Sequence, residues 1–444
     1  MTTIGGKIEQ KGVHVFCSTN VSLHVFSYYG TVGAFTAIPL ESLGNEYIFS
    51  GIDSNPYMGI VGTSDGTNVT VKFRSTCDYA FHQHLYKDGD TITFILNKNE
   101  VFQLSVNTMD YRHYRCDMVG SHIKSTAAVA VFSGSIYHQD ASSHLVLQVP
   151  PPSAFTNLVI LPRLVSSAAW KTNVRIIAAF SNTTLKTPKG VIILNSGEFK
   201  DLTFKAEQDA VIQSDKKVLV IHNCLFVPDG GFTSIVPGVD LYRKNYMIKT
   251  LDKSTSSDSP QQLVVTIVSH TESVHEVEIN GAAPSEITWK HMTSVPYSVG
   301  VVELPTRLVY RVNSTDPILV RVHVYNARQT HGYVAGYKST PVTHKVSEIL
   351  KLQCLSQGYL ITLDLSALDI DVQDSSHIFM TLDTCTGILQ GTVLTFNIPY
   401  ETCGTKVQIK NGRLVFTNTI IYAIPSSDNV IRNSEWEYDI VCGQ

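Results

Sequence analysis

Short runs in which apolar and polar residues alternate recur along the whole chain. They are rich in β-branched and aromatic residues, as in Val69–Phe73, Thr91–Leu96, Leu263–Val268 and Leu308–Val312. Turn-forming stretches separate these runs, and Asn411-Gly412 between two of them is a strong hairpin signal. The 3.6-residue period of an amphipathic helix is hard to find. The pattern predicts an all-β protein built from several β-sandwich-like units.

A strand–turn–strand motif recurs within the first 340 residues. Each copy has an apolar residue, a spacer, a hydroxyl residue, three further residues and then apolar-x-Val. The hydroxyl residues are Ser125, Ser214 and Ser314, and a looser copy contains Thr19. The anchors lie about 100 residues apart, which is the size of one sandwich. The motif predicts several related β units, and the alternative is chance recurrence in an all-β chain.

A polar stretch with a proline, Ser339–Glu348, precedes a C-terminal part of different composition. We therefore expect an N-terminal region of several β units over residues 1–340, a linker at 341–349 and a C-terminal domain at 350–444.

Eight cysteines allow complete pairing, and none has the spacing of a zinc site. The last four lie close together, at Cys354, Cys385, Cys403 and Cys442. This grouping favours a disulfide framework and an extracellular protein; the alternative is a cytosolic protein with eight buried thiols. Four sequons predict N-glycosylation, at Asn20, Asn68, Asn182 and Asn313.

The charge distribution excludes some classes of partner. Only 16% of the residues are charged, below the ~25% that is usual for soluble domains. The net charge is −4, and the basic residues are scattered, so we expect binding neither to nucleic acid nor to an anionic membrane. No apolar run approaches the ~20 residues that span a bilayer. Met1–Gly6 does not begin a signal peptide, so an extracellular protein requires this sequence to be a fragment or an incomplete gene model.

No set of residues indicates catalysis. His82-x-His84, expected on a strand with both imidazoles on one face, lacks a third metal ligand at suitable spacing. Ser133-Gly134 lacks the G-x-S-x-G elbow, and phosphate-binding loops are absent. We expect no catalytic residue, no cofactor and no metal. A sandwich glycosidase is the enzyme alternative, but it needs paired carboxylates that the sequence does not show.

The C-terminal domain resembles the ZP-N half of a zona pellucida module. The resemblance rests on Phe396–Thr405, on Val415–Asn418 and on Ile431 followed by Trp436, Tyr438 and Cys442. It implies an Ig-like sandwich, nested disulfides Cys354–Cys442 and Cys385–Cys403, and a tyrosine near the fourth cysteine, a place that Tyr438 fits. It also implies self-assembly into filaments or matrices. The sequence departs from a full module because it ends two residues after Cys442. The alternative is a disulfide-bonded domain without a role in assembly.

Residues 5–340 resemble the IgGFc-binding protein N-terminal domain. The matching phrases are Ala37–Tyr47, Gln103-Leu104 with Asp117–Ser121, Ala128–Gly134 with His144 and Gln148–Pro151, and Tyr333–Gly336. The chain departs from this family at Ile136-Tyr137 and Ser142-Ser143, where cysteines are usual. Cys77 and Cys116 flank a strand pair and are candidates for one bridge, which leaves Cys17 and Cys224 for a second. Three pairings of these four cysteines remain open.

Together the two resemblances imply a secreted or cell-surface structural or adhesive protein of the extracellular matrix or mucus, in which ZP-N mediates association. The alternative is an extracellular binding module that recognises glycoproteins or immune ligands without polymerising. The expected partners are extracellular proteins or glycoproteins, including a second copy of the chain. Antibody binding is not carried over, because no residues for it can be mapped.

Overall fold

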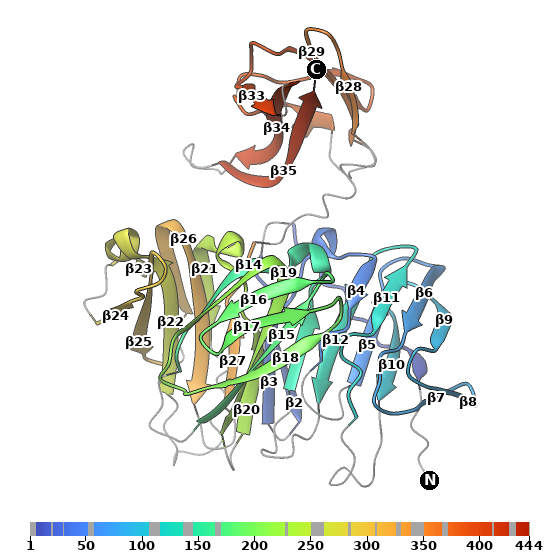
Figure 1. Cartoon of the computed structure of the whole chain (residues 1–444), viewed down its shortest axis with the longest axis vertical. Helices are drawn as coiled ribbons and strands as arrows, with labels where there is room; N and C mark the ends of the chain where they lie inside the picture. Colours follow the sequence, from blue (N-terminus) through green and yellow to red (C-terminus); the bar gives the residue numbers. More distant parts are fainter. Residues whose placement is uncertain are drawn as a thin grey trace. The chain divides into compact units, whose positions relative to one another are not determined.

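The computed structural model describes residues 6–18, 21–29, 31–51, 57–105, 116–135, 145–164, 170–226, 230–249, 262–282, 286–306, 309–325, 330–338, 350–365, 372–410, 413–425 and 432–443. The all-β prediction is confirmed, since antiparallel strands dominate and the helices are short 3₁₀ turns (Figure 1). The chain divides into two compact units, unit 1 (Met1–Ser339) and unit 2 (Thr340–Gln444). The expected linker at 341–349 and the Asn411-Gly412 turn lie outside the described residues.

Unit 1 begins with a hairpin and sandwich A. The hairpin consists of β2 (His24–Tyr29) and β3 (Thr31–Thr36). The first sheet of sandwich A has the order β1 (Lys7–Gln10), β10 (Glu100–Ser105), β5 (Tyr57–Gly62), β12 (Val129–Ser135), β13 (Leu145–Val149). The second sheet has the order β4 (Glu46–Ile48), β11 (His122–Ser125), β6 (Thr67–Lys72), β9 (Thr91–Leu96). A small hairpin of β7 (Tyr79–Phe81) and β8 (His84–Tyr86) lies beside them.

Two further sandwiches follow in unit 1. Sandwich B contains β14 (Thr156–Leu161), β15 (Trp170–Ala178), β16 (Thr183–Thr187), β17 (Gly190–Leu194), β18 (Phe199–Phe204), β19 (Ala210–Phe226) and β20 (Gly230–Ile235). Sandwich C contains β21 (Arg243–Lys249), β22 (Gln262–His270), β23 (Glu278–Ile279), β24 (Thr288–His291), β25 (Tyr297–Leu304), β26 (Val309–Tyr325) and β27 (His331–Val334), with the 3₁₀ turn η4 (Thr271–Glu276).

The three sandwiches repeat one pairing scheme around a strand that passes between sheets. In sandwich A, β11 pairs with β4 and β6, and β12 pairs with β5 and β13. In sandwich B, β19 alone pairs with β14, β16, β15 and β20. In sandwich C, β26 pairs in the same way with β21, β23, β22 and β27. Unit 1 therefore holds three related β units.

The repeated serine marks the point where that strand changes sheets. Ser125 Oγ donates to the carbonyl of Ala127 at 2.7 Å, and Ser214 Oγ donates to the carbonyl of Lys216 at 2.6 Å. Ser314 stands at the corresponding place in β26. The looser fourth match does not mark a fourth unit, because β2, which follows it, pairs with β3 alone among the described strands. Thr19 itself lies outside the described residues.

In sandwiches A and C, a tyrosine hydroxyl connects the segment around β4 or β21 to the part of the chain that changes sheets. Tyr47 Oη accepts from the Gly44 amide at 2.9 Å and donates to the Val129 carbonyl at 2.6 Å. Tyr246 bonds in the same way to the amide three residues before it and to the Ile318 carbonyl. Short 3₁₀ turns stand directly before β4, β14 and β21 of the three sandwiches: η1 (Leu40–Ser42), η2 (Pro152–Ala154) and η3 (Val239–Leu241). The phrase Ala37–Tyr47 thus encodes a turn and its tyrosine anchor.

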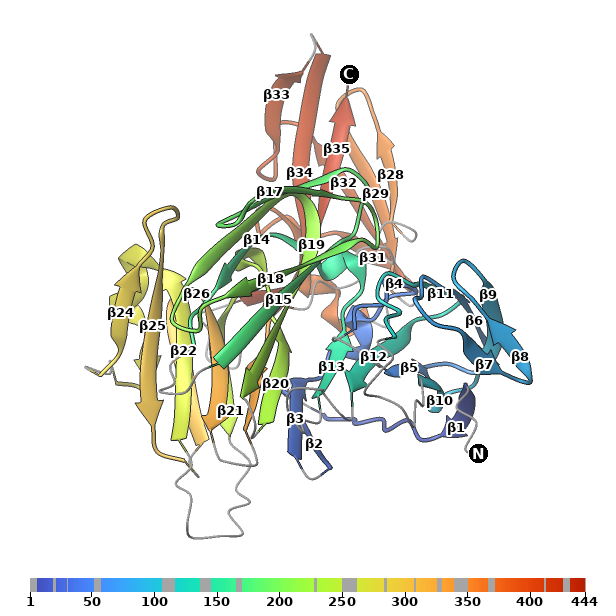
Figure 2. The same cartoon turned by 60° about the horizontal axis from the view of Figure 1, so that its bottom comes forward.

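The three sandwiches lie around the β2–β3 hairpin (Figure 2). Strands β3, β13, β20 and β27 line a cavity of about 30 Å³, to which they contribute residues that include Thr36, Gln148, Ser234 and Val334. Gln148 accepts a hydrogen bond from the Ile38 amide at 2.8 Å, and the Thr36 hydroxyl donates to the Val334 carbonyl at 2.5 Å. The N-terminal hairpin thereby contacts both sandwich A and sandwich C.

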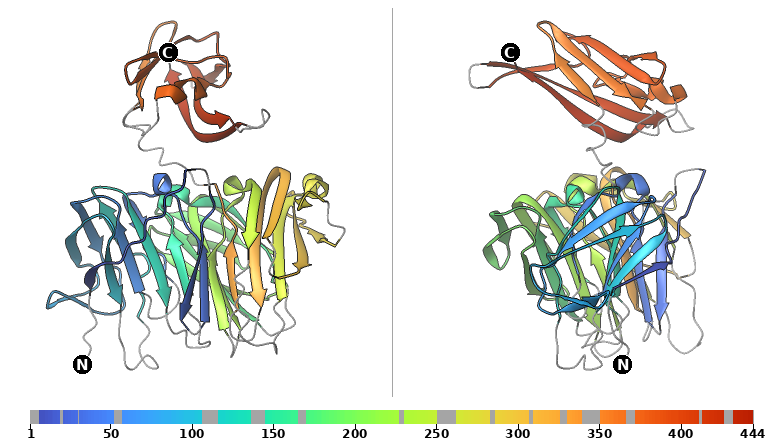
Figure 3. Two further views of the ribbon diagram at one scale, coloured as in Figure 1. Left: turned by 180° about the vertical axis from the view of Figure 1, so that it is seen from behind. Right: turned by 90° about the vertical axis from the view of Figure 1, so that its right-hand side faces the viewer.

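Unit 2 is a separate sandwich of two sheets (Figure 3). One sheet has the order β28 (Lys351–Cys354), β29 (Gly358–Asp364), β32 (Val393–Pro399), β31 (Ile388–Gln390). The other has β30 (Ile378–Met380) and β33 (Lys406–Lys410) on one side of β34 (Arg413–Pro425) and β35 (Arg432–Gly443) on the other. The 3₁₀ turn η6 (Val372–His377) precedes β30. Tyr359, Phe396 and Ile420 belong to the core between the sheets.

Candidate functional site

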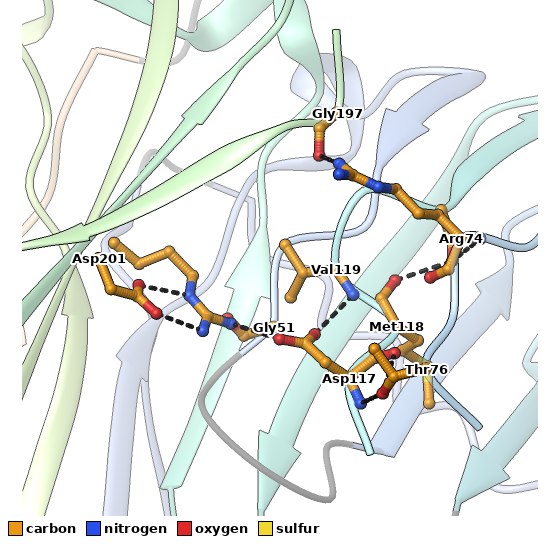
Figure 4. Close-up of polar contacts among 10 residues, drawn as sticks. Gly51, Arg74, Thr76, Asp117, Met118, Val119, Gly197 and Asp201 are labelled. Atoms are coloured by element: carbon orange, nitrogen blue, oxygen red, sulfur yellow. Dashed lines mark hydrogen bonds and ion pairs between the residues drawn. The ribbon is translucent and has the colours of Figure 1, made fainter. Parts of the chain in front are cut away.

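A buried arginine joins sandwich B to sandwich A. Arg175 of β15 donates from Nε and Nη2 to the two carboxylate oxygens of Asp201 on β18, each at 2.8 Å. Its Nη1 lies 3.3 Å from Asp117 Oδ2 and 3.4 Å from the Gly51 carbonyl in sandwich A (Figure 4). The guanidinium carbon stands 4.1 Å above the Phe199 ring. Two carboxylates and a bidentate geometry compensate the buried charge, so this cluster acts as a structural connection between sandwiches.

The turn Asp117–Ser121 forms the sandwich A side of this contact. Asp117 Oδ1 accepts from the Val119 amide at 2.8 Å, and Thr76 Oγ1 accepts from the Asp117 amide at 2.8 Å. Ser121 Oγ accepts from the Arg74 amide at 3.0 Å. These bonds hold the turn rigid, so that the Asp117 carboxylate points toward sandwich B (Figure 4).

Two glycines allow the backbones of the two sandwiches to approach closely. Gly120 has φ of +91°, and a Cβ there would overlap the Gly197 carbonyl oxygen of sandwich B. The same carbonyl accepts from Arg74 Nη1 (Figure 4). The Asp117–Ser121 phrase therefore has a packing role: its Asp, Gly and Ser each serve the contact between sandwiches A and B.

A second buried arginine lies between sandwiches B and C. Arg321 of β26 donates to His222 Nδ1 at 3.2 Å from Nη2 and at 3.3 Å from Nη1, and to Ser234 Oγ at 3.0 Å. Among the described residues no carboxylate lies within ion-pair distance of it. Burial, followed by the charge of Arg321, holds the pKa values of His222 and His323 well below their usual range. Both imidazoles are therefore neutral at pH 7.

Three disulfides are present, Cys77–Cys116 in sandwich A and Cys354–Cys442 and Cys385–Cys403 in unit 2. The two in unit 2 are the nested pairs that the ZP-N resemblance implies. Cys77–Cys116 is one of the pairings that the sequence left open, and Cys116 directly precedes the Asp117–Ser121 turn. Tyr438 is half-buried against the core of unit 2 opposite Ile420, and the Trp436 side chain lies outside the described set.

The possible second bridge, between Cys17 and Cys224, is not formed, and both cysteines are free. Cys224 is buried in β19 beside Leu164 and Phe232, whereas Cys17 is exposed in an unpaired N-terminal segment. Burial raises the pKa of the Cys224 thiol to about 12. Cys224 is thus an interior side chain. The pair was suggested only because these two cysteines remained after the others were paired, and a buried thiol needs no disulfide partner.

The sequons differ in accessibility. Asn68 on β6 is exposed, Asn182 is exposed in the turn before β16, and Asn313 is half-buried in β26. Asn20 lies outside the described residues. Glycosylation therefore remains a prediction, with open access at Asn68 and Asn182.

The expectation that His82 and His84 share one strand is also wrong, because His84 begins β8 but His82 precedes it in a turn. His82 and Gln83 have φ of 46° and 65°, so they form the tight turn between β7 and β8. The His82 ring packs edge-to-face against Phe81, and the His84 ring packs edge-to-face against Tyr86. Within the described part of the chain, no group of three His, Cys, Asp or Glu residues is placed to hold a metal.

Unit 2 carries an apolar row at the end of one sheet. Val407 and Ile409 of β33 lie opposite Phe416 and Leu414 of β34, so all four side chains share the core-facing side. Phe416 is buried, but Val407 is 53%, Leu414 is 43% and Ile409 is 75% exposed. The inner face thus continues past the core as an uncovered apolar strip. In the described part of the sheet, β33 and β35 pair only with β34, so both are edge strands.

Sequence reasoning did not find Arg175 or Arg321. The available signal was a single charge inside an apolar run, Val174-Arg-Ile-Ile177 and Ile318-Leu-Val-Arg-Val322. Such a residue is rarely buried without partners, but the partners become visible only when the sandwiches are packed together.

The family models agree with the two resemblances. The model for IgGFc binding protein matches residues 33–324, and that for the ZP-N domain matches residues 354–443. Neither the curated proteins nor the solved structures contain a match to the chain. Among the described residues no helix has the length and apolar character needed to cross a bilayer. The two domain families and the three disulfides point to an extracellular binding or matrix protein. Because the first match spans more than half of the sequence, the chain belongs to the IgGFc-binding protein family and carries a ZP-N domain at its C-terminal end.

Proposed function

We propose that this protein is a secreted or cell-surface structural and adhesive component of an extracellular matrix or mucus, and that unit 2 mediates its association. The observation that carries the proposal is the uncovered strip of Val407, Ile409 and Leu414 on unit 2. Contiguous apolar side chains at a sheet end are characteristic of protein contact sites. The adjoining edge strands offer unpaired backbone groups for strand addition.

The disulfides support this role for unit 2. Cys354–Cys442 joins the first and last strands, and Cys385–Cys403 closes a shorter loop. By loop entropy these bridges stabilise the fold by roughly 4.5 and 3 kcal/mol. A small sandwich held in this way can expose apolar residues on one strip and still remain folded.

Unit 1 supports a display role. Its buried contacts between sandwiches, at Arg175 and at Arg321, fix three β units into one body. The loops and outer faces of that body are then available to other extracellular proteins or glycoproteins.

Size-exclusion chromatography with light scattering tests the proposal on protein secreted with an added signal peptide. The variant carries Val407→Thr and Ile409→Thr, which keep strand propensity but remove apolar surface. The control is Val441→Thr, which changes an exposed valine on the opposite face of the same unit.

The proposal predicts concentration-dependent oligomers for the wild type and the control, and a monomer for the double variant. Oligomers that persist unchanged in the double variant would contradict association through the strip. A wild-type monomer at every concentration would instead favour the binding module, which needs no association.

A further inference from the structure

Two equivalent hairpins of unit 1 expose an isoleucine on their outer faces. Ile95 of β9 lies opposite Asn68 of β6, and Ile193 of β17 lies opposite Thr184 of β16. Ile95 is 61% exposed and Ile193 is 66% exposed. The hairpins correspond because β6 and β16 each pair with the strand that changes sheets in their own sandwich. Apolar side chains on such outer strands favour unwanted association.

A sequon accompanies the exposed isoleucine in sandwich A. In Asn68-Val69-Thr70, Val69 is buried, so Asn68 and Thr70 face outward with Ile95. Side chains directly opposite each other have Cβ atoms about 5 Å apart. The first sugar on Asn68 Nδ2 would therefore lie over Ile95.

Sandwich B has a second sequon at the same hairpin. In Asn182-Thr183-Thr184, Thr183 is buried opposite Leu194, so Thr184 lies on the outer side with Ile193. Asn182 is exposed in the turn that directly precedes β16. Asn182 has φ of 55°, which asparagine tolerates, and it ends a turn closed by a Thr183 Oγ1 bond to the Phe180 carbonyl. Phe180 and Val191 are also exposed here and enlarge the apolar surface.

The sequon in sandwich C differs. Asn313 is half-buried in β26, between Asn245 of β21 and Glu278 of β23. Among the described sequons, the two that are exposed lie at hairpins whose outer faces expose an isoleucine.

We propose that Asn68 and Asn182 carry N-linked glycans that cover the exposed isoleucines of the two hairpins and keep these faces from associating. In the modification, Asn Nδ2 bonds to the anomeric carbon of an oligosaccharide held on a lipid diphosphate. The bond from that carbon to the diphosphate oxygen breaks, the diphosphate leaves with the electron pair, and the amide releases one proton. The proposal requires passage through a secretory pathway, and it is independent of association through unit 2.

Mass spectrometry of glycopeptides provides the first test, on full-length protein secreted from a eukaryotic host. The proposal predicts that Asn68 and Asn182 are occupied. Bare asparagine at both positions in the folded, secreted protein would overturn it.

Enzymatic removal of the glycans from the folded protein tests the shielding. We expect the fluorescence of a dye that binds apolar surface to rise about twofold or more on removal. In a protein with Ile95→Thr and Ile193→Thr the rise should be clearly smaller, whereas Val309→Thr, at an exposed valine elsewhere in unit 1, should leave it unchanged. An equal rise in the isoleucine variant and the wild type, or no rise in the wild type, would overturn the shielding.

Discussion

Mild acid should weaken the junction between sandwiches B and C through two buried histidines. His222 accepts hydrogen bonds from Arg321 through Nδ1, and His323 stacks on Phe232 at 5.0 Å between ring centroids. Both imidazoles are almost completely buried. A proton on either would place a second positive charge in the interior beside Arg321, where no described carboxylate compensates it.

The sign and size of the effect follow from proton linkage. Burial lowers the folded-state pKa of each histidine well below the ordinary value of 6.5. Below pH 6.5 the unfolded chain therefore binds protons that the folded chain does not, and the stability falls as the pH falls. The contribution is fully present above pH 6.5. Each histidine lowers the free energy of unfolding by up to about 1.4 kcal/mol per pH unit. Because the unfolded histidine is only half protonated at pH 6.5, the loss between pH 6.5 and 5.5 is about 1 kcal/mol per histidine, or about 2 kcal/mol for the pair.

Urea unfolding at pH 7.5, 6.5 and 5.5 measures this dependence. Other groups also titrate in that range, so the comparison is between the wild type and His323→Asn, which cannot be protonated. The variant loses packing at every pH, but about 1 kcal/mol of the acid-dependent loss between pH 6.5 and 5.5 should disappear. His275→Asn, at an exposed histidine, is the control and should keep the wild-type dependence. The reasoning is refuted if His323→Asn and the wild type lose the same stability on acidification.

Local pattern was enough to predict the strands and the repeat. Alternation in Thr91–Leu96 matches its alternate exposure and burial in β9, because the period of a strand is fixed by its backbone. The serine motif succeeded for a similar reason: Ser125 and Ser214 close the same local turn in related strands. The unit 2 cysteine pairs came from the family resemblance and not from the residues themselves.

Contacts between sandwiches could not be predicted from the sequence. Arg175 and Asp117 are 58 positions apart and meet only because two independently formed sandwiches pack together. The failed bridge between Cys17 and Cys224 has the same origin, since burial of β19 is decided by sandwich packing. The His82 turn was missed because tight hairpin turns are signalled by Asn-Gly or Asp-Gly pairs, and His82-Gln83 contains neither.

Three experiments by chemical denaturation test the contacts that hold the sandwiches. Gly120→Ala should lower the free energy of unfolding by about 3 kcal/mol or more, because the added methyl group clashes with the backbone and the positive φ is strained. Gly66→Ala is the control: it also has positive φ but has open space around it, so it should lower the free energy of unfolding by only about 1 kcal/mol. Equal losses for the two variants would exclude the close approach of the sandwiches at Gly120. Tyr47→Phe should cost about 1–2 kcal/mol because a buried amide and a buried carbonyl lose their shared hydroxyl, and an unchanged midpoint would argue against that anchor. Replacing Cys385 and Cys403 by Ser should lower the stability of unit 2 by roughly 3 kcal/mol, and a loss below about 1 kcal/mol would show that the bridge is not needed to hold this sandwich.

Sedimentation velocity of the secreted, oxidised protein over a range of concentrations tests the central claim most directly. The samples are the full chain, with and without reductant, and a chain that lacks residues 350–444. Association through unit 2 predicts that the full oxidised chain forms oligomers that grow with concentration, and that the shortened chain sediments as a monomer. A full chain that stays monomeric throughout, or a shortened chain that associates equally well, would contradict the claim.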